Sequence, residues 1–169
     1  PVDQPEREMD DVLREEVVAG AYWAVPPSAR TEIAIAYSGA MAPEALEAFE
    51  QLREDMPDAA LLAVTSADKL HGDWQAAKRE RRQGTTEARS HVERLLDRLP
   101  RSAALVSVLD GHPATLSWIG AVGGHRAYPL GVESFGQSAD LPDLYRINGI
   151  DADGILDACA RACLAALGR

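Results

Sequence analysis

Three side chains have the types needed for a hydrolytic triad, and each follows an apolar run. Ser38 ends the run IAIAYS, and Asp110 and His112 follow the run ALVSVL. A serine, an imidazole and a carboxylate in mutual contact form a nucleophile for acyl transfer. Ser38 lies in AYSGA, which lacks the first glycine of the G-x-S-x-G turn. We keep a Ser38 hydrolase as an alternative, and expect Ser38 and Asp110 to bond backbone donors at helix starts.

A glycine-containing segment, residues 131–151, has the composition of a phosphate-binding loop. It reads GVESFGQSADLPDLYRINGID, without the G-x-x-x-x-G-K-[ST] motif, and no G-x-G-x-x-G follows a predicted strand. Structural roles account for most of its residues. We expect Phe135 to anchor the loop in the core and Asp140 to cap a helix, with Gly149 ending that helix and Asp151 capping the next.

A few polar side chains remain as candidates for binding. His112 is the best single one, because parallel sheets place ligands beyond the carboxyl ends of their strands. A hydrogen bond within its own turn is the competing interpretation. The full set of candidate ligand or rim residues is Ser38, Ser66, His112, Gln137 and Ser138.

The cysteine and histidine spacing predicts no metal site. Cys159 and Cys163 are four residues apart on one face of a predicted helix, where a disulfide is not favoured. Neither a histidine nor a third cysteine is near them in sequence, so we interpret them as a buried apolar pair. The basic run KRERRQG is a solvated helix face or, alternatively, a grip for an acidic partner.

Strands alternate with helices along the chain, which predicts an α/β fold with a mostly parallel sheet covered on both faces. We expect five strands, the first of them at an edge because two prolines follow it. The predicted strands are AYWAV, TEIAIAYS, DAALLAVTS, AALVSVLDG and AYPLGVES. Helices are predicted over 6–19, 41–56, 86–99, 113–124, 141–148 and 152–167, and 67–84 is a polar, partly helical connection.

Bulk composition limits the function classes. The chain has 169 residues and a net charge of −10, which suits one domain and disfavours nucleic-acid or anionic-membrane partners. It has no apolar stretch long enough for a membrane span and no signal peptide, and we expect a cytoplasmic protein. The chain starts at Pro1 inside a charged segment. We interpret residues 1–5 as a linker from a longer polypeptide and residues 6–169 as a single domain.

Four segments after the predicted strands are more specific together than any single motif. They read AYSGAMAPEALEA, LAVTSADKLHGDW, VLDGHPATLSWIGAV and PLGVESFGQSADLPDLYRINGIDADGI. From about Gly20 onward, the chain resembles the C-terminal domain of transketolase-like, thiamine-diphosphate-dependent enzymes. The resemblance is strongest to the homodimeric first component, a decarboxylating dehydrogenase, of the pyruvate dehydrogenase complex.

This resemblance implies a three-layer fold with a five-stranded mixed sheet and one antiparallel edge strand. It implies a parent enzyme that is a 2-oxoacid dehydrogenase (an oxidoreductase) or a transketolase-like transferase. The parent's other domains would bind thiamine diphosphate and magnesium through Gly-Asp-Gly and paired asparagines. This chain has HGDWQ and LDGHP instead, so no catalytic, cofactor-binding or metal-binding residue is carried over.

The resemblance also implies partners. These are the remaining domains of the polypeptide, a second subunit in a homodimer and, in a multienzyme complex, an acyltransferase. The domain would support the dimer and shape the rim of the active site. The alternative is a freestanding regulatory domain that holds a small anion near Ser38, Ser66, His112 and Ser138.

Overall fold

The computed structural model describes residues 8–134 and 138–167, and its centre is one five-stranded mixed sheet. The strand order is β1-β3-β2-β4-β5, with β1 antiparallel to β3 and the other neighbours parallel. This confirms the predicted fold class and the position of the first strand at an edge. The strands are β1 Ala21–Val25, β2 Ile33–Ser38, β3 Ala60–Val64, β4 Ala104–Leu109 and β5 Arg126–Leu130.

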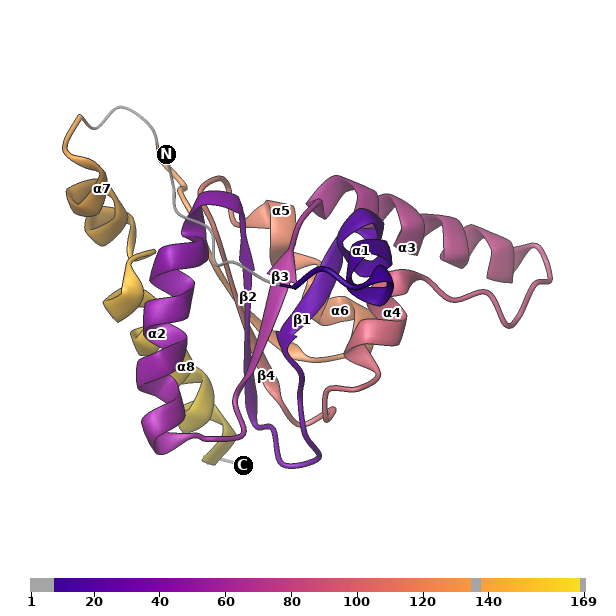
Figure 1. Cartoon of the computed structure of the whole chain (residues 1–169), viewed down its shortest axis with the longest axis horizontal. Coiled ribbons are helices and arrows are strands. Elements are labelled where there is room, and N and C mark those ends of the chain that lie inside the picture. Colours follow the sequence, from indigo (N-terminus) through magenta and orange to yellow (C-terminus); the bar gives the residue numbers. More distant parts are fainter. Residues whose placement is uncertain (1–7, 135–137, 168–169) are drawn as a thin grey trace.

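Helices cover both faces of the sheet (Figure 1). On one face lie α2 (Ala42–Asp55) and α8 (Ala152–Leu167), with α7 (Leu141–Asn148) beyond them. The other face carries α1 (Asp11–Ala19), α3 (Ala67–Arg82), α4 (His91–Leu96), α5 (Ala114–Ser117) and α6 (Ile119–Gly123). A 3-10 turn, η1 (Gly39–Met41), joins β2 to α2. No helix in the described part of the chain is long and apolar enough to cross a membrane.

The sequence of β2 explains how the two faces differ. Its side chains alternate, so Ile33 and Ile35 enter the core beneath α2 and α8, while Ala34 and Ala36 enter the core on the opposite face. All four residues have no exposed surface. A strand with both faces covered reads as a continuous apolar run, and β3 and β4 are buried throughout in the same way.

Several helix boundaries differ from the sequence prediction. The connection predicted to be partly helical is one continuous helix, α3, capped by Ser66. The helix predicted over 86–99 contains only His91–Leu96, because Ser90 starts it with a capping box to Glu93. The predicted helix over 113–124 is two short helices, α5 and α6.

The helix before β1 is also shorter than predicted. It begins at Asp11 because Asp10 accepts a hydrogen bond from the Leu13 amide at 2.7 Å, and it ends at Gly20 in the left-handed conformation (φ 114°). Residues 1–7 lie outside the described part. At the other end of the chain, Gly149 ends α7 with φ 62°, as predicted.

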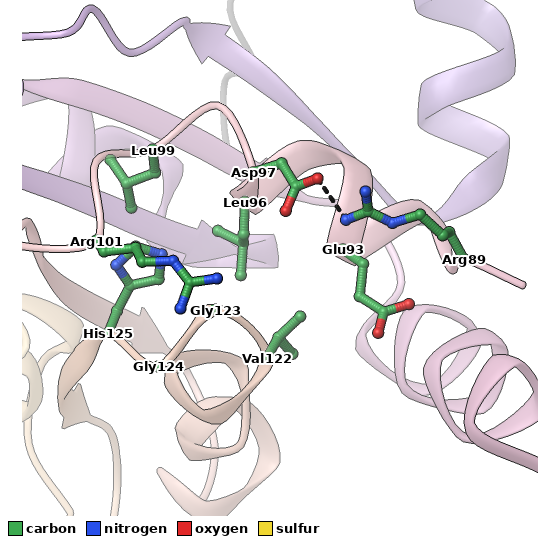
Figure 2. A pocket seen from close by; sticks show the side chains of 10 residues that line it. All are labelled: Arg89, Glu93, Leu96, Asp97, Leu99, Arg101, Val122, Gly123, Gly124 and His125. Atoms are coloured by element: carbon green, nitrogen blue, oxygen red, sulfur yellow. Dashed lines mark ion pairs between the residues drawn. The ribbon is translucent and has the colours of Figure 1, made fainter. Parts of the chain in front are cut away.

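A cleft of about 340 Å³ opens between α4 and α6, where β4 and β5 begin (Figure 2). Arg89 and Asp97 form an ion pair at its rim. His125 lines the cleft and is buried, and its Nδ1 lies 3.2 Å from the Ala103 carbonyl oxygen. This cleft lies at the edge of the sheet opposite the strand ends that the sequence singled out.

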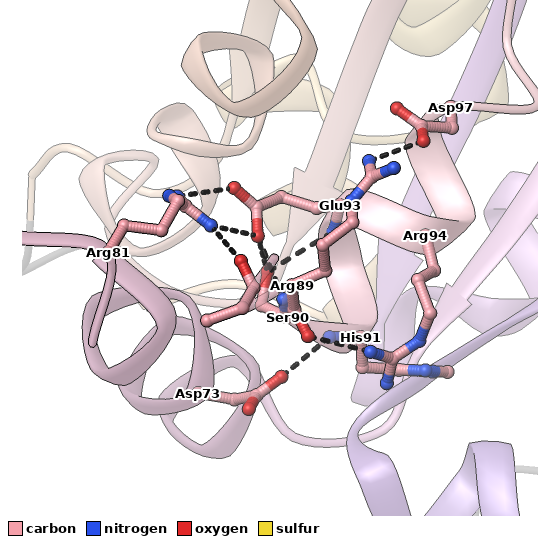
Figure 3. A network of polar contacts seen from close by, with 9 residues as sticks. Asp73, Arg81, Arg89, Ser90, His91, Glu93, Arg94 and Asp97 are labelled. Carbon is pink, nitrogen blue, oxygen red and sulfur yellow. Dashed lines mark hydrogen bonds and ion pairs between the residues drawn. The ribbon is translucent and has the colours of Figure 1, made fainter. Parts of the chain in front are cut away.

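A polar network ties α3 to α4 (Figure 3). Arg81 donates to both carboxylate oxygens of Glu93, at 2.8 and 3.2 Å, and to the Ala88 carbonyl. Glu93 Oε2 also accepts from the backbone amide and the hydroxyl of Ser90, each at 2.8 Å. Arg81 is therefore held by Glu93 and Ala88. It does not belong to the solvated basic face that the run KRERRQG predicted.

The loop after β5 is locked to the loop after β4 by a backbone contact. Val132 donates its amide proton to the Gly111 carbonyl oxygen at 2.8 Å. A Cβ on Gly131 would overlap the Gly111 carbonyl oxygen and lie 2.9 Å from the Pro113 nitrogen. Glycine is therefore required at position 131 by this close approach, rather than by a phosphate.

The Glu93 network makes a prediction about pH. Burial would raise the pKa of Glu93, but hydrogen bonds from Arg81 and Ser90 outweigh it and the pKa lies below its ordinary 4.5. The unfolded chain therefore binds the proton more tightly, and the stabilisation is lost as pH falls from about 4.5 through the folded-state pKa. Glu93→Gln should lower the free energy of unfolding at pH 7 by about 1–3 kcal/mol.

Urea unfolding at pH 7 and pH 3 checks this. The difference between wild type and Glu93→Gln should shrink at pH 3, whereas the exposed control Glu87→Gln should change little at either pH. A difference that is the same at both pH values would contradict the role of the charged carboxylate.

The contact at Gly131 makes a second prediction. Gly131→Ala should lower the free energy of unfolding by about 1–3 kcal/mol, because the methyl group meets backbone atoms that cannot move independently. Gly72→Ala is the matched control, since Gly72 lies inside α3 with no atom near its Cβ position. That substitution should stabilise by about 0.5–1 kcal/mol. Equal effects of the two, measured by thermal unfolding, would argue against the close approach.

Candidate functional site

The carboxyl edge of the sheet brings together most residues that the sequence singled out. Four parallel strands end there, so the loops that carry Ser38, Ser66, Asp110 and His112 share one edge. Ser138 precedes α7 and is exposed. Gln137, together with Phe135 and Gly136, lies outside the described residues. The predicted anchoring of the loop by Phe135 stays a prediction.

The geometry does not assemble the triad. The Ser38 hydroxyl donates to the Val64 carbonyl oxygen at 3.0 Å, across the β2–β3 pair. His112 is exposed and its Nδ1 accepts from the Ala114 amide at 3.2 Å, within its own turn. The expectation that Ser38 bonds a backbone donor at a helix start is wrong. Its hydroxyl instead donates to a backbone carbonyl oxygen of the neighbouring strand.

Ser66 and Asp151 cap helices, whereas Asp140 does not. Ser66 accepts from the Lys69 amide at 3.4 Å and starts α3. Asp151 accepts from the Gly154 amide at 3.1 Å, as predicted for α8. Asp140 occupies the N-cap position of α7, but its side chain makes no capping hydrogen bond. The predicted Asp140 cap is therefore wrong, and the first turn of α7 has Pro142, which has no amide proton to offer.

Two residues that the sequence did not single out complete this edge. Tyr145 of α7 is buried, and its pKa is raised by that burial and then by the carboxylates of Asp110 and Glu44. Glu44 of α2 accepts from the Ala152 amide at 3.0 Å and so caps α8 from another helix. The phenol stays protonated at neutral pH and can only donate a proton in a hydrogen bond or accept one. Neither residue has a motif; only the fold brings them together.

An aromatic cluster lies between α3 and α5, on the face of the sheet opposite α2 and α8. Trp74 and Trp118 stack with ring centroids 5.4 Å apart, and His71 meets Trp118 edge-on at 4.8 Å. Lys78 lies over the Trp74 ring, 4.2 Å from its centroid. These rings fasten the short helices to α3. No local sequence pattern predicts the cluster, because Trp74 and Trp118 are far apart in the chain.

Both basic and acidic side chains line the cleft around His125. Burial lowers the pKa of His125, so the imidazole is neutral at pH 7. Its Nε2 is enclosed against Gly123, where a Cβ would come within 2.5 Å of it. Both α4 and α6 end at the cleft, so the partial negative charge of their carbonyl ends opposes an anion there. We assign no ligand to this cleft.

The described residues do not offer a site for a hard divalent metal. Within residues 8–134 and 138–167, no three histidine, cysteine, aspartate or glutamate side chains converge. The carboxyl edge supplies single hydrogen-bonding groups, most of them already used by backbone atoms. Among the described residues of this edge, the Ser38 hydroxyl and the His112 imidazole are bonded to backbone groups and do not contact each other.

Comparison with known proteins identifies the fold. The description "Transketolase-like TK C-terminal domain" matches residues 20–151. No curated protein matches. Among solved structures, transketolase from Pichia stipitis in complex with sedoheptulose-7-phosphate is 20% identical, with a TM-score of 0.61 over 92% of this chain and 19% of that one.

Two further structures show the same fold. Transketolase from Leishmania mexicana is 20% identical, with a TM-score of 0.59 over 85% of this chain and 18% of that one. A split-gene transketolase, described as an inactive beta4 tetramer, is 16% identical, with a TM-score of 0.58 over 96% of this chain and 46% of that one. This chain thus spans less than half the length of these transketolases. With its mixed sheet and the match over residues 20–151, the chain belongs to the transketolase-like C-terminal domain family.

Proposed function

We propose that this chain is the C-terminal domain of a thiamine-diphosphate-dependent, transketolase-like enzyme, and that it supports subunit assembly and the active-site rim. The observation that carries the proposal is the family match over residues 20–151. The chain accounts for 19% of the Pichia stipitis transketolase, so most of such an enzyme lies in other domains. Because the described residues offer no donor set for magnesium and a diphosphate, no chemical step is assigned to them.

Two exposed apolar side chains on α7 support the assembly role. Leu141 and Ile147 are 53% and 57% exposed, although Tyr145 on the same helix is buried. Exposed apolar surface of this kind is available for contact with another protein surface. The helix lies at the end of the molecule where α2 begins, close to the carboxyl edge (Figure 1). We assign this surface to a second subunit of a homodimer or to another domain of the same polypeptide.

The parent chemistry is a finer proposal. The segments VTSADKL…DW and GVESFGQSADLPDLY resemble the first component of the pyruvate dehydrogenase complex. On that basis, the parent is a decarboxylating 2-oxoacid dehydrogenase and an oxidoreductase, with an acyltransferase as its partner in a multienzyme complex. The competing parent is a transketolase acting on ketose phosphates. Carbon dioxide release from pyruvate, measured beside ketol transfer, distinguishes the two in the full polypeptide.

Isolation of the domain makes one prediction about cofactors. Titration of thiamine diphosphate and magnesium into the 169-residue chain should give no saturable heat by calorimetry, because the residues of the cofactor motif are not in this segment. The result should be the same for wild type and for His112→Ala. Saturable binding in the micromolar range would contradict the proposed division of labour, and its loss in His112→Ala would place a ligand site at the carboxyl edge.

The exposed apolar residues of α7 make a prediction about assembly. In the full polypeptide encoded by the reading frame, Ile147→Asp should weaken dimerisation at least about tenfold, because a buried contact would have to accept a charge. Sedimentation equilibrium measures the dissociation constant. Thr86→Asp is the control, since Thr86 is an exposed polar residue in the loop between α3 and α4, on the other face of the sheet. Equal effects of the two variants, or none, would count against an interface at α7.

A further inference from the structure

A groove between α1 and α4 has the lining that would seat another helix. Its volume is about 500 Å³, and each wall contributes four residues at the spacing i, i+3, i+4 and i+7, which is one stripe of a helix. We propose that this groove receives α1 of a second copy of the chain, so that two copies form a symmetric dimer. The α1 wall is Val12, Glu15, Glu16 and Ala19, and the α4 wall is His91, Arg94, Leu95 and Arg98.

The two walls are joined at their base by β1. The helix α1 ends at Gly20 and the chain enters β1 at once, while Nε2 of His91 lies 2.7 Å from the Ala21 carbonyl oxygen. The Trp23 indole donates to the Leu95 carbonyl oxygen at 3.1 Å, which holds α4 against the same strand. The groove is therefore already formed in the single chain, and a partner can dock without rearranging α4.

The helix α1 is only partly covered by its own molecule. None of its residues is buried, and Val12, at the groove, is 66% exposed. Leu13 and Val17, on another side of the helix, are half-buried. A helix of this length is not stable in water without packing. A second helix against the Val12 side would remove apolar surface from water that the single chain leaves exposed.

The two walls of the groove carry opposite charges that are not paired with each other. Glu15 and Glu16 make one wall acidic, and Arg94 and Arg98 make the other basic. Among the ion pairs of the described residues, none joins these carboxylates to these guanidinium groups. Arg94 donates to the Arg89 carbonyl oxygen, which is a neutral partner. The α1 wall of a second copy supplies the carboxylates that the basic wall lacks.

Symmetry favours a second copy as the occupant. In a two-fold interface the same patch serves both molecules, so each contact occurs twice. With α1 of each copy in the groove of the other, Glu16 of one copy can face Arg98 of the other, and the reverse. The chain has a net charge of −10, so two copies repel each other over most of their surface. The opposite charges of the groove therefore select which surfaces meet.

This dimer is independent of the contact surface proposed at α7. The helices α1 and α4 lie on the face of the sheet opposite α2 and α8, and α7 lies beyond those two (Figure 1). Substitutions at the two surfaces can therefore be compared in one assay.

Sedimentation equilibrium of the 169-residue chain at low ionic strength tests the dimer, because salt screens exposed charge pairs. We expect a reversible equilibrium between monomer and dimer. Arg98→Glu and Glu16→Arg should each raise the dissociation constant at least about tenfold, since each brings like charges together twice in the symmetric interface. The double variant, Glu16→Arg with Arg98→Glu, exchanges the charges of the two walls and should restore most of the affinity.

Arg79→Glu is the matched control, because Arg79 is exposed on α3 outside the groove and should leave the dissociation constant unchanged. Circular dichroism establishes that each variant is folded before it is sedimented. The proposal is wrong if the chain stays monomeric up to about 1 mM. It is also wrong if Arg98→Glu behaves like Arg79→Glu, or if the double variant dimerises no better than the single ones. A dimer that Ile147→Asp abolishes and Arg98→Glu does not affect would assign the contact to α7 instead.

Discussion

The parallel pairing of β2 with β3 on one side and β4 on the other is the constraint on which the rest of the structure depends. Because β2 is buried on both faces, each neighbouring strand must be followed by a crossover that returns over one face. Those crossovers are α2 between β2 and β3, α3 and α4 between β3 and β4, and α5 and α6 between β4 and β5. They place the ends of the four parallel strands at one edge. The antiparallel β1 then closes the sheet beside β3 and is held by Trp23, whose indole donates to the Leu95 carbonyl oxygen at 3.1 Å.

The same constraint explains why the two edges of the sheet differ in character. At the carboxyl edge, polar side chains are hydrogen-bonded to backbone groups: the Ser38 hydroxyl donates to a carbonyl oxygen of β3, and the Ser66 hydroxyl caps α3. The backbone of Gly131 also lies directly against that of Gly111. At the amino edge, the connections leave clefts, one around His125 and one beside Met56. Parallel α/β enzymes usually place their ligands at the carboxyl edge, but we assign no catalytic role to Ser38, Ser66 or Gly131. We propose that this edge contacts other domains.

Sequence patterns predicted the sheet well, because apolar alternation and continuous apolar runs report burial directly. Ile33 and Ile35 and the inward residues Val92, Leu95, Leu96 and Leu99 are all buried, as their spacing indicates. Helix ends were less predictable. The start of α4 depends on the capping box between Ser90 and Glu93. The helix α3 is continuous although its composition is polar, and its partners Trp118 and Glu93 lie far along the chain, so no local pattern indicates these contacts.

The candidate sites were harder still, because each requires residues that are distant in sequence. His112 was identified from its position after a strand, but its imidazole is used within its own turn. Tyr145 and Glu44 are brought together only by the packing of α7 and α8 against α2, and the two walls of the groove only by the packing of α1 and α4 on β1. No local spacing encodes such pairs. The segments that follow successive strands did, however, indicate the transketolase-like C-terminal domain family.

The central claim is that this chain completes a cofactor-dependent enzyme whose catalytic parts lie in other domains. The most direct test is calorimetric titration of thiamine diphosphate, with magnesium, into the full polypeptide encoded by the reading frame that contains these residues. We predict saturable, magnesium-dependent binding by that polypeptide. A full polypeptide that binds no thiamine diphosphate, alone or with the subunits that co-purify with it, would contradict the account.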